Sequence, residues 1–274
     1  MVLFALSAVF VWIVIWYFIS SLSESVRKRD HQLSIANEQL RRAEEEKTRQ
    51  VLITTHELKS PFAGIENNIQ VLRYQYWDQI SPEMQKIIER IEARAQTLRE
   101  RIRKILMHGD LKSSEPVEDK MASTDIKSVI DSVMEELRDK ARERNIEVDI
   151  QVPNAVVLGD TKNLSIFFSN LISNAIYYSY EGGKVEITGK ENTESVYVSV
   201  RDHGTGIRED ALPKIFDEYF HTNEAAKFNK MSTGLGLSMV KETARRLGFK
   251  ISVTSSPGEG TTFNVKLPKG KKRK

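Results

Sequence analysis

The sequence contains no cysteine, and its basic residues exceed its acidic ones by only 3. Without thiols the chain has no disulfide, no thiolate nucleophile and no zinc site built on sulfur. A net charge of +3 is too small to imply nucleic-acid binding by itself. No internal repeat is present, and neither a Walker A nor a GxGxxG motif occurs, which excludes P-loop and Rossmann nucleotide sites. The rest of the composition, 40% hydrophobic and 29% charged, predicts a largely folded chain.

Charge is also missing from the first segment, MVLFALSAVFVWIVIWYFIS, residues 1–20. Twenty uncharged residues are about the length that spans a bilayer core, and a signal peptide would need a basic start. Trp16 and Tyr17 suit an aromatic belt, and the basic residues 27–29 place the rest of the chain in the cytoplasm. We expect a single-pass helix in the plasma or inner membrane. The alternative is a buried core helix, which no later segment is apolar enough to surround.

Residues 21–50 are highly charged, with Val26, Leu33 and Leu40 at heptad spacing. This pattern predicts a parallel two-stranded coiled coil. Apolar spacing resumes at Val51, eleven residues after Leu40, as a stutter would place it. A merely frayed segment is the alternative.

The segment 51–112 has two apolar seams with alternating spacings of four and three, but Pro61 interrupts the first one. An interior proline costs about 3 kcal/mol, so we expect a bend next to His56. The second helix should begin at Pro82 with Ser81 as N-cap. Such a hairpin cannot bury its seams alone, and two copies would form a dimeric four-helix bundle. The seam residues are Leu58, Phe62, Ile65, Ile69 and Leu72, then Met84, Ile88, Ile91, Ala95, Leu98, Ile102 and Ile105.

After a polar linker at 113–120, residues 121–268 alternate between helical and strand patterns. Helices are expected over 126–144, from Asp160 onward and near 236–247. Strands are expected at 146–152, 184–190, 195–202, 250–256 and 261–267. This order predicts an α+β layer, a sheet with helices on one face. The basic end, residues 269–274, is typical of a solvated tail, with anionic lipid as a minor alternative partner.

Four short motifs in this last region carry chemistry. DHGTGI (202–207) follows a strand, STGLGLSMVK (232–241) leads into a helix, and GEGTTF (258–263) enters the final strand. Backbone N–H groups at a helix start attract anions. In NLISN, Asn170 and Asn174 share one helix face, and their amide oxygens suit Mg2+. Each motif alone is weak evidence for a ligand.

Together, these motifs and HELKSP resemble the sensor histidine kinases of two-component systems, in order and in spacing. The resemblance covers residues 51 to about 268. It implies a dimerisation and histidine phosphotransfer domain at 51–112, followed by a Bergerat-type ATP-binding sandwich at 121–268. The implied partners are a second copy of the chain and a response regulator receiver domain, and the implied cofactors are ATP and Mg2+.

The resemblance also assigns roles to individual residues. His56 would attack the γ-phosphate, Glu57 would accept a proton from the imidazole, and Ser60 would position water in a weak phosphatase reaction. Asn174, assisted by Asn170, would hold Mg2+, and Asp202 would accept the adenine amino group. Residues 221–233 would form a lid over ATP. The remaining cofactor-binding residues would be Gly204, Gly206, Lys227, Lys230, Thr233, Gly234, Leu235, Gly236, Leu237 and Thr261.

The chain departs from the family pattern at two positions. Tyr177 and His221 stand where the family usually has basic residues, so slow autophosphorylation is expected. An alternative is therefore a slow or inactive nucleotide-binding scaffold. A gyrase-like hydrolase is disfavoured because Asn170 replaces the glutamate that would activate water. The other histidines, His31, His108, His203 and His221, are expected to be solvated.

Overall fold

The computed structural model describes residues 2–113, 122–222 and 233–270. The chain divides into two units, Met1–Ile53 and Thr54–Lys274. Helix α1, Val2–Gln75, begins in the first unit and ends in the second. The first unit is therefore helical, as a coiled coil requires. The pairing with a second chain stays a prediction.

The membrane span predicted at the apolar start of α1 falls largely on side chains outside the described part of the chain. No helix in the described part of the chain holds a stretch both long and apolar enough to cross a bilayer. Apart from Trp12, the side chains before Ile15 lie outside that part. The span predicted for residues 1–20 thus stays a prediction.

Helix α1 continues through Pro61 and ends at Gln75. The proline therefore does not terminate the helix. A short 3-10 helix, η1 (Trp77–Gln79), leads into α2, Pro82–Ser113. The Ser81 hydroxyl accepts a hydrogen bond from the Met84 N–H at 3.3 Å, which confirms the predicted cap. Helix α2 runs past Gly109, so the polar residues there extend the helix.

In the second unit, the hairpin of α1 and α2 buries only part of its apolar seams. Ile69, Ile88 and Ala95 are buried together, with Phe62 and Trp77 packed against them. Ion pairs between Arg73 and Glu92 and between Arg99 and Glu66 join the two helices. Six other seam residues are exposed, with Leu58, Ile65, Leu72, Met84, Ile91 and Leu98 each more than 40% accessible. A single hairpin therefore leaves an apolar face uncovered.

The domain beyond α2 is built on a five-stranded sheet with the order β2-β4-β5-β7-β6. Only β2 and β4 run parallel, and the other neighbours in this sheet are antiparallel. The central β5 buries Val196, Val198 and Val200, which alternate along it. The strands are β2 (Glu147–Gln151), β4 (Lys184–Glu191), β5 (Ser195–Asp202), β6 (Lys250–Ser256) and β7 (Gly260–Pro268).

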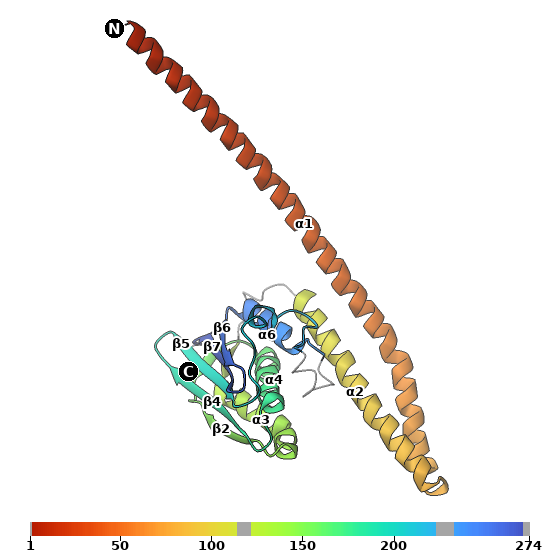
Figure 1. Cartoon of the computed structure of the whole chain (residues 1–274). Helices are drawn as coiled ribbons and strands as arrows, with labels where there is room; N and C mark the ends of the chain where they lie inside the picture. The colour runs from red at the N-terminus through yellow and green to blue at the C-terminus, as the bar shows by residue number, and fades with distance from the viewer. Residues whose placement is uncertain (1, 114–121, 223–232, 271–274) are drawn as a thin grey trace. The chain divides into compact units, whose positions relative to one another are not determined.

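Three helices cover one face of this sheet (Figure 1): α3 (Ile126–Glu143), α4 (Thr161–Tyr178) and α6 (Gly236–Leu247). The Asp125 and Asp160 carboxylates cap α3 and α4 by accepting hydrogen bonds from backbone N–H groups. Phe167 and Phe168 of α4 are fully buried in the core between helices and sheet. The predicted α+β layer is confirmed.

Some local features were not predicted. Strands β1 (Ser123–Asp125) and β3 (Val156–Leu158) form a separate two-stranded sheet, and η2 spans Leu212–Lys214. The tail prediction is wrong for its first two residues. The Lys269 amine pairs with Glu191 at 3.0 Å, and the Gly270 N–H donates to the Val156 carbonyl at 2.8 Å. Residues 271–274 lie outside the described chain.

Candidate functional site

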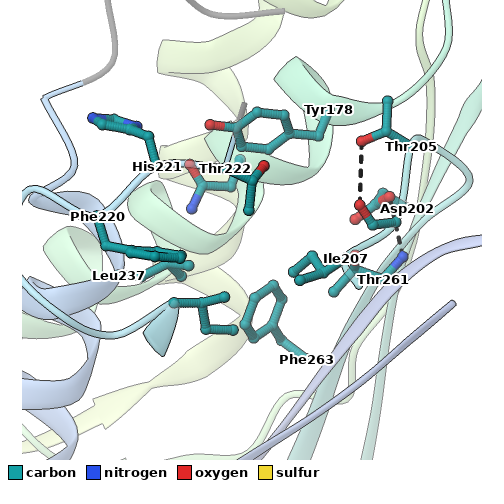
Figure 2. A pocket seen from close by; sticks show the side chains of 13 residues that line it. Tyr178, Asp202, Thr205, Ile207, Phe220, His221, Thr222, Leu237, Thr261 and Phe263 are labelled. Carbon is teal, nitrogen blue, oxygen red and sulfur yellow. Dashed lines mark hydrogen bonds between the residues drawn. The ribbon is translucent and has the colours of Figure 1, made fainter. Parts of the chain in front are cut away.

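Two adjoining pockets lie where α4, α6 and the ends of β5 and β7 meet. The first is mostly apolar with one carboxylate (Figure 2), and the second is polar. Both are lined by Asn174, Tyr178, Phe220 and Leu237, so they form one continuous cleft. The first pocket is lined by Asn174, Tyr178, Asp202, Thr205, Gly206, Ile207, Ile215, Phe220, His221, Thr222, Leu237, Thr261 and Phe263.

Asp202 lies at the end of β5 and is only 4% exposed. Its Oδ1 accepts hydrogen bonds from the Gly204 N–H at 3.1 Å and the Thr261 N–H at 3.2 Å. Burial raises the pKa of the Asp202 carboxyl to about 6, while these two N–H donors oppose the rise. The carboxyl is therefore held in the pocket as a hydrogen-bond acceptor that is mainly ionised at pH 7.

Backbone packing behind Asp202 requires glycine. Gly206 has a φ of +63°, and a Cβ there would lie 1.9 Å from the Ser256 carbonyl oxygen. A Cβ on Gly204 would meet the Tyr178 carbonyl oxygen at the same distance, 1.9 Å. The DHGTG motif therefore lets the turn after β5 pass against α4 and the end of β6.

The apolar walls of the first pocket can accept a flat ring. Figure 2 shows Ile207, Leu237 and Phe263 around the open space, with Asp202 and Thr261 at one end. Phe263 is held edge-to-face by Phe216, with ring centroids 6.5 Å apart. An apolar slot with one acceptor at its end has the chemistry that an adenine base requires.

The second pocket contains the asparagine pair and the start of α6. Asn170 donates its Nδ2 hydrogen to the Ile166 carbonyl at 2.8 Å, which leaves its Oδ1 available as a ligand. A Cβ on Gly236 would lie 3.0 Å from that Oδ1, so the first residue of α6 lies against the pair. No described side chain caps the N-terminus of α6, whose N–H groups can therefore bind an anion.

The residues present fit Mg2+. Asn170 and Asn174 are half-buried on one face of α4 and line the second pocket. Two neutral oxygens suit a cation that keeps several waters and bridges phosphates. The described residues contain no cluster of three or more His, Cys, Asp and Glu side chains that could hold a metal.

Most of the other predicted cofactor-binding residues also lie at this cleft. Thr233, Gly234 and Gly236 line the second pocket. Leu235 is buried, and its N–H lies 3.4 Å from the Thr233 hydroxyl. Lys227 and Lys230 fall outside the described residues, as does most of the predicted lid.

The three predicted catalytic residues lie elsewhere. His56, Glu57 and Ser60 are exposed on α1, with His56 and Ser60 four residues apart on one face. Among the described residues that line the two pockets, none belongs to α1. Phosphate transfer would therefore require the cleft and His56 to approach each other.

Two of the other four histidines, His108 and His203, are not solvated as expected. His108 of α2 is buried, 7% exposed, and its Nε2 lies 3.8 Å from Glu218. His203 is half-buried and contacts Glu186 at 3.1 Å. His221 is exposed, as predicted, but it lines both pockets. His31, on α1, is exposed as predicted.

Sequence reasoning also missed several lining residues, among them Tyr178, Ile207 and Phe263. All three are next to or near motifs that the sequence reveals. Ile207 ends DHGTGI and Phe263 ends GEGTTF, so attention to apolar neighbours of the polar motifs would have found them.

Comparisons with known proteins agree with this geometry. Residues 159–271 match the family model of the histidine kinase-, DNA gyrase B- and HSP90-like ATPases. Sensor histidine kinase AtsR of Burkholderia thailandensis is 30% identical over 227 residues, which are 79% of this chain and 36% of that protein. SenX3 of Mycolicibacterium smegmatis is 28% identical over 78% of this chain and 55% of that protein. The chain spans about a third to a half of the length of such relatives.

Solved structures show the same fold. ShkA in complex with AMPPNP superposes with a TM-score of 0.68 at 23% identity, over 81% of this chain and 46% of that one. AdeS of Acinetobacter baumannii gives a TM-score of 0.51 at 20% identity, over 79% of this chain and 98% of that one. The chain is therefore a member of the sensor histidine kinase family, and residues 159–271 are the part that matches the ATPase family model.

Proposed function

We propose that this chain is a membrane-anchored, homodimeric histidine kinase that phosphorylates His56 from Mg-ATP. The observation that carries the proposal is the continuous cleft, in which the buried Asp202 carboxylate lines the apolar compartment, Asn170 lines the polar one and Asn174 lines both. The apolar compartment suits adenine, and the polar one suits phosphates with Mg2+. The family membership supports the same assignment.

The chemistry would divide between the two regions. A ring nitrogen of His56 attacks the γ-phosphorus, the bond to the β–γ bridging oxygen breaks, and ADP leaves. Glu57 takes the proton from the other ring nitrogen. Bound Mg2+, held by Asn174 and Asn170, would neutralise charge on the phosphate oxygens. The phosphoryl group then passes to an aspartate of a response regulator receiver domain, and Ser60 would support a weak reverse phosphatase reaction.

The dimer is proposed from the hairpin. Its exposed seam residues alternate with the buried ones on α1 and α2. One line of apolar side chains therefore packs within the hairpin, and the other line is exposed to solvent. The same face on a second copy would cover that line and complete a four-helix bundle. The uncharged residues 1–20 would hold the dimer in the membrane, with the rest of the chain in the cytoplasm.

A slow or inactive nucleotide-binding scaffold is the second candidate. It is favoured by Tyr177 and His221, which line the second pocket where a basic residue would stabilise the transferring phosphoryl group. A hydrolase would also bind Mg-ATP, but it would transfer the phosphate to water.

Incubation of the full chain with γ-labelled ATP and Mg2+ separates these functions. A kinase yields labelled protein whose phosphate is lost in acid and kept in alkali, as expected for phosphohistidine. A hydrolase releases labelled inorganic phosphate and leaves the protein unlabelled. Nucleotide binding without either product would contradict the proposal and favour the scaffold.

A further inference from the structure

The second pocket is lined by basic side chains that are not among the predicted nucleotide-binding residues. Arg101, Lys104 and Lys140 line it, and Glu100 is the only carboxylate among its described lining residues. No ion pair of Lys140 or Lys104 exists in the described part of the chain. Unpaired ammonium groups gathered at a cleft repel one another, and an anion in the cleft would relieve that repulsion.

Lys140 lies on α3, and the contact between α3 and α4 fixes where it sits. Arg144, four residues further along, donates hydrogen bonds to the Tyr177 carbonyl and, at 2.9 Å, to the Ser179 carbonyl. Residues four apart share one helix face. Lys140 therefore lies one turn earlier, on the face of α3 that packs against α4. The corresponding turn of α4 contains Ser173 and Asn174, which line the same pocket as Lys140.

Lys140 of α3 and Arg144, the C-cap of that helix, differ in what they can bind. The Arg144 guanidinium is occupied by the carbonyl groups at the end of α4 and acts as a link between the helices. Lys140 is half-buried and lines the pocket of the asparagine pair and of the uncapped α6 N-terminus. A compact ammonium group in that position suits phosphate oxygens.

We propose that Lys140 binds the polyphosphate end of the nucleotide, with Lys104 of α2 adding a second positive charge to the same subsite. The inference rests on the proposed function, because it names a further ligand-binding residue of the ATP site. It assigns Lys140 no role in binding the adenine ring, which lies with Asp202 in the other compartment.

The test is calorimetric titration of the full chain and of Lys140→Gln with ATP, ADP and adenosine, each with Mg2+ and with EDTA. Lys140→Gln should weaken ATP binding roughly tenfold, about 1.4 kcal/mol, and ADP binding by less. Adenosine affinity should stay within about twofold, since adenosine carries no phosphate. The effect should persist in EDTA, because it does not pass through the metal. Added salt should weaken ATP binding to the parent more than to the variant.

Lys162→Gln is the matched control, because Lys162 is an exposed lysine at the start of α4 that lines neither pocket. It should leave all three affinities unchanged. Lys104→Gln should weaken ATP binding by about threefold, as expected for a more exposed charge. If Lys104→Gln leaves ATP affinity unchanged, as Lys162→Gln should, Lys104 does not contribute to phosphate binding.

Two outcomes overturn the Lys140 assignment. One is an unchanged ATP affinity in Lys140→Gln, and the other is an equal loss of ATP and adenosine affinity, which would indicate a structural role. The proposed function fails differently. If the parent chain binds ATP in this way but His56 is never labelled, the Lys140 subsite stands and the proposed kinase function is wrong.

Discussion

The ATP-binding domain and the His56 segment of α1 differ in how they present functional residues. In the domain, side chains from β5, β7, α4 and α6 converge on one cleft, and Asp202 at its floor is buried. On α1, His56, Glu57 and Ser60 are consecutive or one turn apart, and all are exposed. The first region encloses a cleft, whereas the second presents its side chains to solvent.

This difference implies that binding and transfer can be separated by mutation. Changes in the cleft should alter nucleotide affinity and leave the acceptor helix intact. Changes on α1 should remove transfer and leave the cleft intact. Variants at Asp202, Asn174, Ser60 and His56 test that division one region at a time.

The largest effect on binding is expected at Asp202. Asp202→Asn replaces an ionised acceptor by a neutral amide, which can keep the bonds from Gly204 and Thr261 through its Oδ1. Losing a charge-assisted hydrogen bond to the adenine amino group should weaken ATP binding by ten- to a hundredfold, roughly 1.5–3 kcal/mol. Calorimetry checks this, with GTP as a control ligand whose base lacks the adenine amino group. Equal ATP affinity in parent and variant would show that Asp202 does not contact the base.

The same substitution makes a prediction about stability and pH. Because burial raises the pKa of the Asp202 carboxyl to about 6 from 3.8, the folded state binds its proton more tightly than the unfolded state. This contribution to stability is complete below about pH 4 and is lost as pH rises through 6. Without nucleotide, Asp202→Asn should therefore gain up to about 3 kcal/mol over the parent between pH 4 and pH 7. Thermal unfolding of both proteins at each pH measures the gain, and a difference independent of pH would contradict it.

Sequence reasoning recovered much of this domain because its motifs are local. Asp202, Gly204 and Gly206 are close in sequence and also in space around the pocket. The strand at β5, the Ser81 cap and the helix start at Asp160 were equally readable. The parallel pairing of β2 with β4 and the small β1–β3 sheet were not, because pairing partners are set by tertiary contacts rather than by local pattern.

Residues whose role depends on a distant element were missed for the same reason. Lys140 has no motif around it and reaches the cleft only because α3 lies along α4. His108 looks like any polar helix residue, yet it is buried beside Glu218, 110 residues away along the chain. Burial of single polar residues arises from packing between elements, which periodicity does not specify.

An intermediate effect is expected at the metal ligands. Asn174→Asp places a negative charge next to the phosphates and changes the ligation of Mg2+. Autophosphorylation should fall at least about tenfold, roughly 1.4 kcal/mol of transition-state stabilisation. The measurement is the initial rate of labelling at saturating Mg-ATP, with adenosine binding as the control for folding. Unchanged turnover would make Asn174 a structural residue.

The smallest effect is expected on α1 at Ser60. Ser60→Thr should clear phosphate from a phosphorylated receiver domain several-fold faster than the parent, because a threonine rotamer is stiffer and positions water better. Ser60→Ala should lose this activity, and both variants should keep autophosphorylation nearly intact. Decay of labelled receiver domain with Mg2+ and ADP measures the rate. Clearance by Ser60→Ala at the parental rate would leave Ser60 a solvated helix residue.

The central claim is that the cleft binds ATP and that exposed His56 alone receives its phosphate. It is tested most directly by His56→Gln, with ATP affinity and labelling measured on the same preparation. The account predicts parental ATP affinity and complete loss of the acid-labile label, because no residue of the cleft is changed. Labelling of His56→Gln at the parental level would contradict it.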